Sequence, residues 1–461
     1  MLKKLYYTGF LVYAGLLALS VVFYKERTIL LDNSLFLFDM LREDGFCIQR
    51  NRFIVVLPQL LPLLAAKFSL SLKWVMISFS AGYMLYHVFC YFLCGLLKNY
   101  RLGIALLLVN TLVVAHTFFW HLSELSLGIS LLFPFFALFV DKQHKLNKPA
   151  QYVLIAAGLI TIVFSHPLII FPFFFIIAFL WLRENIKPER RVLIITSALF
   201  IIVYFVKKKI LPDTYESNSS YLLTNNLKSN YPDYFSMYSN TRFFSNWFYI
   251  FYWLPVFFIT VLVFYAWKRQ WLKFFLVFLA CTGYSQVVNI SYPGYNTPDF
   301  YWENMYTTLG LFLALPLAYD LFPILWGKRK FLVPATCLLI AGTAFLRINM
   351  LRQDYRGRID WFRGYMDKYR NEKMMVNMYG KPQETIIMEW ASPYEFWLLS
   401  TLERDTTASI IIHKNVEEIG WAWENYRAFV TTWGVYPYKD LNPRYFKFRD
   451  TTRHYSVYKD R

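Results

Sequence analysis

Long apolar runs separated by short basic clusters constrain this chain more than any other feature of its sequence. Of its 461 residues, 57% are hydrophobic and only 17% are charged, whereas soluble domains carry about 25% charged residues. Several runs approach the ~20 residues of an upright transmembrane helix, which predicts an all-α polytopic membrane protein with about eleven transmembrane helices. The runs are residues 5–24, 74–97, 102–120, 125–140, 151–165, 168–182, 192–206, 247–267, 271–290, 305–326 and 331–348.

The basic clusters between the runs set the expected orientation. Because Lys and Arg are enriched in cytoplasmic loops, we expect the clusters on that side together with Lys3 and Lys4. The apolar stretch 53–68 is then re-entrant or interfacial, because a crossing there would send every later cluster outside. This predicts a multi-pass membrane protein with a cytoplasmic N-terminus and an extracytoplasmic C-terminus. The clusters are 98–101, 141–148, 183–191, 268–269 and 327–330.

Two domains are expected from the distribution of polar residues. Residues 1–348 form a transmembrane domain with outer loops at 25–73, 207–246 and 291–304. Residues 349–461 form a small soluble extracytoplasmic α/β domain, here called the tail. Its predicted elements are an amphipathic helix at 352–372, strands at 384–389 and 409–413, and a helix at 393–402.

The formal net charge of +18 does not indicate nucleic-acid binding in this chain. The basic residues lie in short clusters between apolar runs, where they anchor loops and contact membrane lipids. The five cysteines form no disulfide framework or zinc-ligand spacing, since four of them lie inside apolar runs.

Four acidic residues follow the first apolar run and are the candidate catalytic residues: Asp32, Asp39, Glu43 and Asp44. A carboxylate at the membrane surface can act as a general base on an acceptor hydroxyl or hold a divalent cation. The alternative is a solvated interfacial helix, because Asp32 and Asp39 share one helical face and the apolar residues between them would lie along the bilayer. The need for a metal is left open.

Two further groups are candidates for binding. His166 precedes Pro167 at a turn between apolar runs, and a polar residue at such a break typically lines a cavity. Lys207, Lys208 and Lys209 would lie at an outer helix end, against the orientation rule. They indicate a local error in the topology, ordinary lipid anchoring, or a site for the phosphate of a lipid-linked donor.

The order of these motifs resembles the GT-C superfamily of membrane glycosyltransferases. Asp32 lies in LLDNSLFLFDMLRED, and RNRFIVVLPQLLPLL supplies Arg50 or Arg52 before an apolar stretch with two prolines. SHP at 165–167 resembles an outer turn of some members. WENMY at 302–306, which leads into a helix with Leu-Pro, resembles a late segment of the family, with Asn304 in place of its arginine.

The resemblance, which is greatest to bacterial members of the superfamily, implies a GT-C fold in a bacterial inner (cytoplasmic) membrane. It also implies transfer of a sugar from a polyprenyl-phosphate carrier to a glycan or lipid acceptor at the outer face. Asp32 would deprotonate the acceptor hydroxyl, with the other three acids as alternates or metal ligands. The implied substrate-binding residues are Arg52 and Lys207 to Lys209 at the donor phosphate, and His166, Glu303 and Tyr306 around the cavity. Two alternatives remain: a lipid or polysaccharide transporter or flippase, and a non-catalytic envelope assembly factor.

Overall fold

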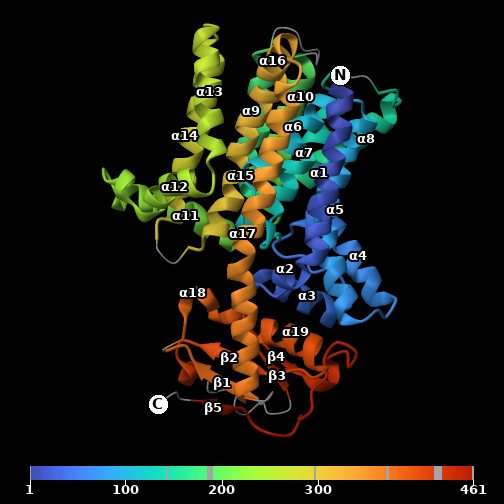
Figure 1. Ribbon diagram of the computed structural model, residues 1–461, viewed down its shortest axis with the longest axis vertical. Coiled ribbons are helices and arrows are strands. Elements are labelled where there is room, and N and C mark those ends of the chain that lie inside the picture. The colour runs from blue at the N-terminus through green and yellow to red at the C-terminus, as the bar shows by residue number, and fades with distance from the viewer. Residues whose placement is uncertain are drawn as a thin grey trace.

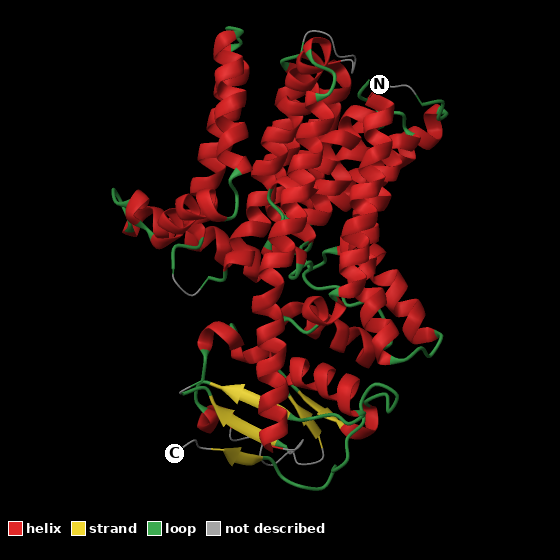
Figure 2. Ribbon diagram, viewed as in Figure 1, coloured by secondary structure: helices red, strands yellow, loops and turns green. Residues whose placement is uncertain are grey.

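The computed structural model describes residues 2–141, 144–183, 190–294, 297–369, 373–379, 381–419 and 428–458. The structure is 75% helical, and the strands of the described ranges lie in the tail, as Figure 2 shows. Parts of the predicted clusters 141–148 and 183–191 and of the outer loop 291–304 fall outside the described ranges.

Several helices are long and apolar enough to cross a membrane, so the protein is a multi-pass membrane protein. Five such helices are found in the described ranges, and a sixth is counted if α12 and α13, bent by 90°, form one span. The prediction of a largely helical membrane protein is confirmed, whereas the count of eleven spans is not. The five are α1 (Leu2–Val22), α5 (Leu72–Leu96), α14 (Trp271–Ser291), Asp299–Lys328 and α17 (Leu332–Tyr369), and the bent pair is α12 (Tyr238–Tyr249) with α13 (Trp253–Trp267).

Shorter helices fill the rest of the bundle. The helix α6 (Tyr100–Leu112) and the span that begins at Asp299 are buried over most of their length, which places them at the centre of the bundle. The span at Asp299 comprises α15 (Asp299–Pro316), a π-helical turn (Leu317–Leu321) and α16 (Phe322–Lys328). The others are α2 (Tyr24–Thr28), α3 (Leu31–Glu43), α4 (Val56–Lys67), α6 (Tyr100–Leu112), α7 (Glu124–Ala137), α8 (Lys148–Val163), α9 (Ile170–Trp181), α10 (Arg190–Ile210) and α11 (Thr214–Ser229).

The predicted basic clusters and the tail lie at opposite ends of the bundle. In Figure 1 the N-terminus and α16 lie at one end, and α3, α4 and the tail lie at the other. At the end with α16, Asp320 accepts hydrogen bonds from Lys273 (3.0 Å) and Tyr265 (2.8 Å) and lies 3.9 Å from Arg183. These contacts join segments next to three of the predicted basic clusters, so those clusters gather at the end remote from the tail.

The helix α4 occupies the apolar stretch for which an interfacial position was predicted. Its 12 residues span roughly 18 Å, too short for a ~30 Å hydrocarbon core. Figure 1 shows it beside the tail end of α5, next to α3. Its contact with α5 is close, because a Cβ added at Gly82 would lie 2.2 Å from the backbone oxygen of Pro58.

Gly82→Ala is therefore expected to separate α4 from α5 and to destabilise the protein by about 1–3 kcal/mol, the usual cost of overpacking a close contact. Gly283→Ala is the matched control, since nothing lies within 4 Å of a Cβ at that position of α14. Thermal unfolding of the purified variants measures both. Equal melting temperatures for the two variants would contradict the close packing of α4 on α5.

The tail is a small α/β unit, as predicted, but its strands only partly match the expectation. The helix α19 and the strand β2 are confirmed, whereas a strand at 384–389 is wrong. There the N–H groups of Thr385 and Ile386 bond the carbonyl of Pro382 and form a helical turn, α18 (Gln383–Ile386). A parallel sheet has the order β2-β1-β5, and β3 pairs antiparallel with β4. The bounds are β1 (Met374–Asn377), α19 (Ser392–Arg404), β2 (Ile410–His413), β3 (Ala428–Val430), β4 (Val435–Pro437) and β5 (Ser456–Tyr458).

Two of the elements that join the tail to the bundle are α17 and α3. The predicted helix at 352–372 is the continuation of α17, whose 38 residues extend roughly 57 Å from the bundle into the tail, as Figure 1 shows. The second element is α3, whose Phe38 is fully buried against aromatic rings of the tail. Those rings belong to Tyr394, Trp397, Phe429, Tyr436 and Phe446. Helix α3 and the tail therefore share one core.

Candidate functional site

A cavity of about 610 Å³ lies at the tail end of the bundle. Helices α7, α9, α10, α11, α14 and α15 contribute to its wall, and Met388 reaches it from the tail. Its apolar lining residues are Leu125, Leu168, Ile170, Phe171, Leu223, Val287, Val288 and Met305. Its polar and aromatic lining includes Arg52, Trp120, Ser123, Glu124, His166, Tyr204, Tyr215, Glu216, Ser219, Ser220, Ser291, Tyr292, Thr297, Tyr301 and Asn304.

Asp32 stands directly behind this lining, in the first turn of α3. Its Oδ2 accepts hydrogen bonds from the indole Nε1 of Trp120 (3.1 Å) and from the hydroxyl of Tyr301 (3.3 Å). Both partners line the cavity. Burial raises the pKa of Asp32 to about 6, and the two hydrogen bonds oppose this rise because they favour the carboxylate. Asp32 is thus a carboxylate at neutral pH with a pKa close enough to 7 to accept a proton.

The backbone before Asp32 is held by the tail. The N–H of Leu31 donates to Glu395 Oε1 at 2.6 Å, and Arg358 donates to the carbonyl of Ile29 at 3.0 Å. Arg358 and Glu395 also form a 2.5 Å ion pair in which both side chains are buried. Leu31 has a φ of 44°, a conformation rare for a branched residue, so these contacts hold the entry to α3 in a strained geometry.

Arg52 and Lys207 bring positive charge to the cavity. Arg52 is 7% exposed, lines the cavity and pairs with Glu124 at 3.2 Å. Lys207 is 6% exposed and lies 3.5 Å from both Glu216 Oε1 and the carbonyl of Val163. Since Glu216 lines the cavity, Lys207 stands behind it. The charges of the wall are therefore partly neutralised and fixed in place.

His166 lines the cavity as a neutral imidazole. Burial, together with the nearby cations Arg52 and Lys207, lowers the pKa of His166 well below its usual value. Its Nδ1 accepts a hydrogen bond from the N–H of Leu168 at 3.2 Å. The neutral ring then carries its proton on Nε2, which can donate to an oxygen atom in the cavity.

The other three predicted acids lie apart from Asp32. Asp39 and Glu43 both pair with Arg42, at 3.1 Å and 2.5 Å, and Asp44 pairs with Lys67. Within the residues that the structure describes, no group of three or more His, Cys, Asp or Glu side chains is arranged to hold a metal ion. The structure thus places one of the four predicted acids, Asp32, directly behind the lining of the cavity.

Four predicted binding residues also lie elsewhere. Lys208 and Lys209 are exposed. Glu303 is buried and accepts hydrogen bonds from the N–H groups of residues 115–117 at 2.7–2.9 Å, so it holds the turn after α6. Tyr306 donates to Asn289 Oδ1 at 2.5 Å inside the bundle. These last two residues have structural partners that use their polar atoms.

Two residues that contribute to the site were not predicted from the sequence. Trp120 binds Asp32, and Glu395 holds the segment that carries it. Trp120 lies at the end of an apolar run where a tryptophan is ordinary, and Glu395 lies 363 residues after Asp32 in a helix that the sequence shows only as amphipathic. The aromatic residues around Tyr301, next to an acidic residue, were the one feature of the sequence that indicated this part of the site.

Comparisons with protein-family models, with curated proteins and with solved structures found no match for this chain.

Proposed function

We propose that the protein is a membrane glycosyltransferase that moves a sugar from a polyprenyl-phosphate carrier to a hydroxyl acceptor. The observation that carries this proposal is that Arg52 and His166, which are far apart in the sequence, line one cavity of about 610 Å³, and that Asp32 lies directly behind two other residues of its lining. Its volume is within the range of small-molecule sites, about 300–1,000 Å³. The basic clusters at the remote end support a reaction on the extracytoplasmic side of a bacterial inner membrane.

The cavity offers suitable surfaces to both parts of such a donor. The apolar lining residues, which include Leu168, Phe171 and Val287, suit an isoprenoid chain that enters from the membrane. The aromatic and hydroxyl residues, which include Tyr204 and Tyr292, suit a sugar, which needs ring faces and hydrogen-bonding groups together. Arg52 and His166 also line the cavity, and the phosphate would lie against them.

In the proposed reaction Asp32 accepts the proton of the acceptor hydroxyl as its oxygen bonds to the anomeric carbon of the sugar. The bond from that carbon to the phosphate oxygen breaks, and its electron pair stays on the polyprenyl phosphate. Arg52, the Nε2–H of His166 and the charge of Lys207 stabilise the negative leaving group. Trp120 and Tyr301 orient the carboxylate through their hydrogen bonds.

Reconstituted full-length protein tests the proposal. Proteoliposomes would receive undecaprenyl-phosphate-linked glucose, mannose or arabinose with a bacterial lipid extract as the acceptor source. Mass spectrometry should detect undecaprenyl phosphate and an acceptor heavier by one sugar residue. If none of the donors were consumed, or if wild type and Asp32→Asn consumed them equally, the proposal would be wrong.

The proposed base gives an expected pH dependence. Because burial raises the pKa of Asp32 to about 6, kcat/KM should be independent of pH near 7.5 and fall about tenfold per pH unit below 6, as the carboxylate is protonated. Burial lowers the pKa of His166 well below its usual value, so the acid limb is assigned to Asp32. The residual activity of Asp32→Asn should lack the acid limb. A wild-type profile that is flat from pH 7.5 to 5 would exclude Asp32 as the base.

A further inference from the structure

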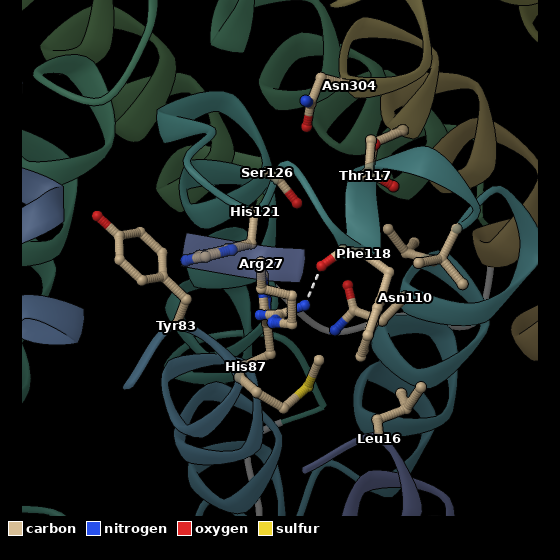
Figure 3. Close-up of a pocket in the computed structure, with 14 residues that line it drawn as sticks. Leu16, Arg27, Tyr83, His87, Asn110, Thr117, Phe118, His121, Ser126 and Asn304 are labelled. Atoms are coloured by element: carbon tan, nitrogen blue, oxygen red, sulfur yellow. Dashed lines mark hydrogen bonds between the residues drawn. The ribbon is translucent and has the colours of Figure 1, made fainter. Parts of the chain in front are cut away.

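A second, smaller pocket lies deeper in the bundle. It holds about 60 Å³, enough for a few water molecules or one small ion, given about 10–15 Å³ per water on this measure. Figure 3 shows Arg27, His87 and His121 close together, with Asn110 and Thr117 across from them. None of its 14 lining residues is acidic.

Arg27 is a buried charge without a counter-ion. It is 1% exposed, and among the described residues no carboxylate lies within ion-pair distance of it. Its Nε donates to the hydroxyl of Ser80 (2.7 Å) and its Nη2 to the Ser80 carbonyl (3.1 Å), while Nη1 donates to the carbonyl of Phe118. These acceptors are all uncharged. Because guanidinium stays protonated in proteins and an unpaired buried charge is costly, this arrangement calls for an anion.

Arg27 also has the donors for such an anion. Three of its five N–H groups are used, which leaves one on each Nη atom. Two N–H groups on neighbouring nitrogens match two oxygens of a tetrahedral oxyanion.

His121 supplies an independent indication. It lines the pocket and is 9% exposed, and its Nε2 is buried without a hydrogen-bond partner. Its Nδ1 donates to the carbonyl of Phe119 at 3.3 Å, so Nε2 becomes a donor to an oxyanion when the ring takes up a proton together with the anion. A buried polar atom left unpaired is rare and points to a missing partner in the pocket. His87 lines the same space, and its Nδ1 lies 2.8 Å from the hydroxyl of Ser130, so its Nε2 is the nitrogen free to face a ligand.

We propose that this inner pocket binds a small oxyanion of the phosphate or sulfate class, with Arg27 and His121 as its main ligands. Asn304 lines both this pocket and the large cavity, so the two are neighbours. The pocket has room for the oxyanion and not for an isoprenoid chain, which favours a free anion over the phosphate of a lipid. This inference does not depend on the glycosyltransferase proposal.

Thermal unfolding of the purified full-length protein tests the site with inorganic phosphate and sulfate, and with chloride at matched ionic strength. Phosphate and sulfate should raise the melting temperature saturably, because they bind only the folded state, and chloride should not. His121→Ala keeps every hydrogen bond of Arg27 and should weaken phosphate affinity about tenfold or more. Arg27→Lys, which retains the charge and loses the paired donors, gives a second test should His121→Ala fail to fold.

Arg52→Gln removes the cation that the proposed function assigns to the donor phosphate in the large cavity. A phosphate shift that arises in the inner pocket should persist in this variant, because Arg52 does not line that pocket. Equal shifts with all three anions, or a phosphate shift retained by His121→Ala and Arg27→Lys, would overturn the proposal. So would a shift lost only in Arg52→Gln. Undecaprenyl phosphate distinguishes a free anion from a lipid phosphate as the ligand of the inner pocket. If its shift in melting temperature requires Arg52 and not His121, the lipid phosphate binds in the large cavity, which supports a free anion in the inner pocket. If that shift requires His121, the oxyanion site of the inner pocket binds a lipid phosphate. A phosphate response without sugar transfer would refute only the glycosyltransferase proposal.

Discussion

Asp32→Asn is expected to reduce sugar transfer by about 10²–10⁴-fold, the usual contribution of a general base. The amide has nearly the shape of the carboxylate, and its oxygen can still accept a hydrogen bond from Trp120 or Tyr301. The variant should therefore fold normally, and KM for the donor should change little, because the donor phosphate is assigned to Arg52 and His166. Initial rates from reconstituted protein, with a melting temperature as the folding check, measure the effect.

Asp39→Asn is the control for this variant. Asp39 lies on the same helix, α3, but pairs with Arg42 and does not contact the cavity wall. Its replacement should change the rate less than about twofold, since a partly exposed ion pair contributes little even to stability. If the two asparagine variants lost activity equally, the loss would come from α3 as a whole, and the assignment of Asp32 as the base would fail.

Glu395→Ala should have the largest effect on stability, about 3–5 kcal/mol, because it leaves Arg358 as an uncompensated buried charge. The side chains of the pair are 3% and 1% exposed, and the same carboxylate accepts the N–H of Leu31 at 2.6 Å. Asp367→Asn is the control: its partner is Arg404, its side chain is 75% exposed, and its loss should cost about 0–1 kcal/mol. Chemical denaturation of the detergent-solubilised protein compares the two.

A double variant separates stability from the position of Asp32. Glu395→Leu with Arg358→Met replaces the buried pair by apolar side chains and should recover part of the lost stability. It does not restore the acceptor for Leu31 or the donor to Ile29. Sugar transfer should therefore stay low, with kcat reduced and the acid limb of the pH profile shifted. Full activity in the double variant would show that Glu395 does not position Asp32.

These contacts give the tail a role in the site. Helix α3 inserts Phe38 into the core of the tail, the buried pair fixes the entry to α3, and Met388 lines the cavity. The tail is thus part of the framework that places the acidic residue at the cavity. A boundary at residue 348 divides the sequence by composition, but α17 continues through it without interruption.

The predictions that the structure confirms rest on local patterns. Apolar runs predict helices because the backbone N–H and C=O groups of a segment in a membrane must be hydrogen-bonded, and a helix pairs them within that segment. The strand at 409–413 and the helix at 393–402 have alternation and amphipathic spacing that need no distant partner. At 384–389 the prediction of a strand from apolar residues was wrong. Ile386 and Ile387 belong to a segment that packs beside α17 and does not pair in the sheet.

Local patterns do not tell which polar atoms meet. Glu303 and Asp32 are both acids beside aromatic residues, yet three backbone N–H groups hold Glu303 in a structural role while Asp32 lies against the cavity wall. A hydrogen bond depends on the positions of two atoms, and for Leu31 and Glu395 those atoms are separated by 364 residues of chain. The sequence by itself determines that the protein is a helical membrane protein and which acidic and basic residues are candidates for the site. Packing settles which of them face one cavity, because burial and partners act only once the helices are in place.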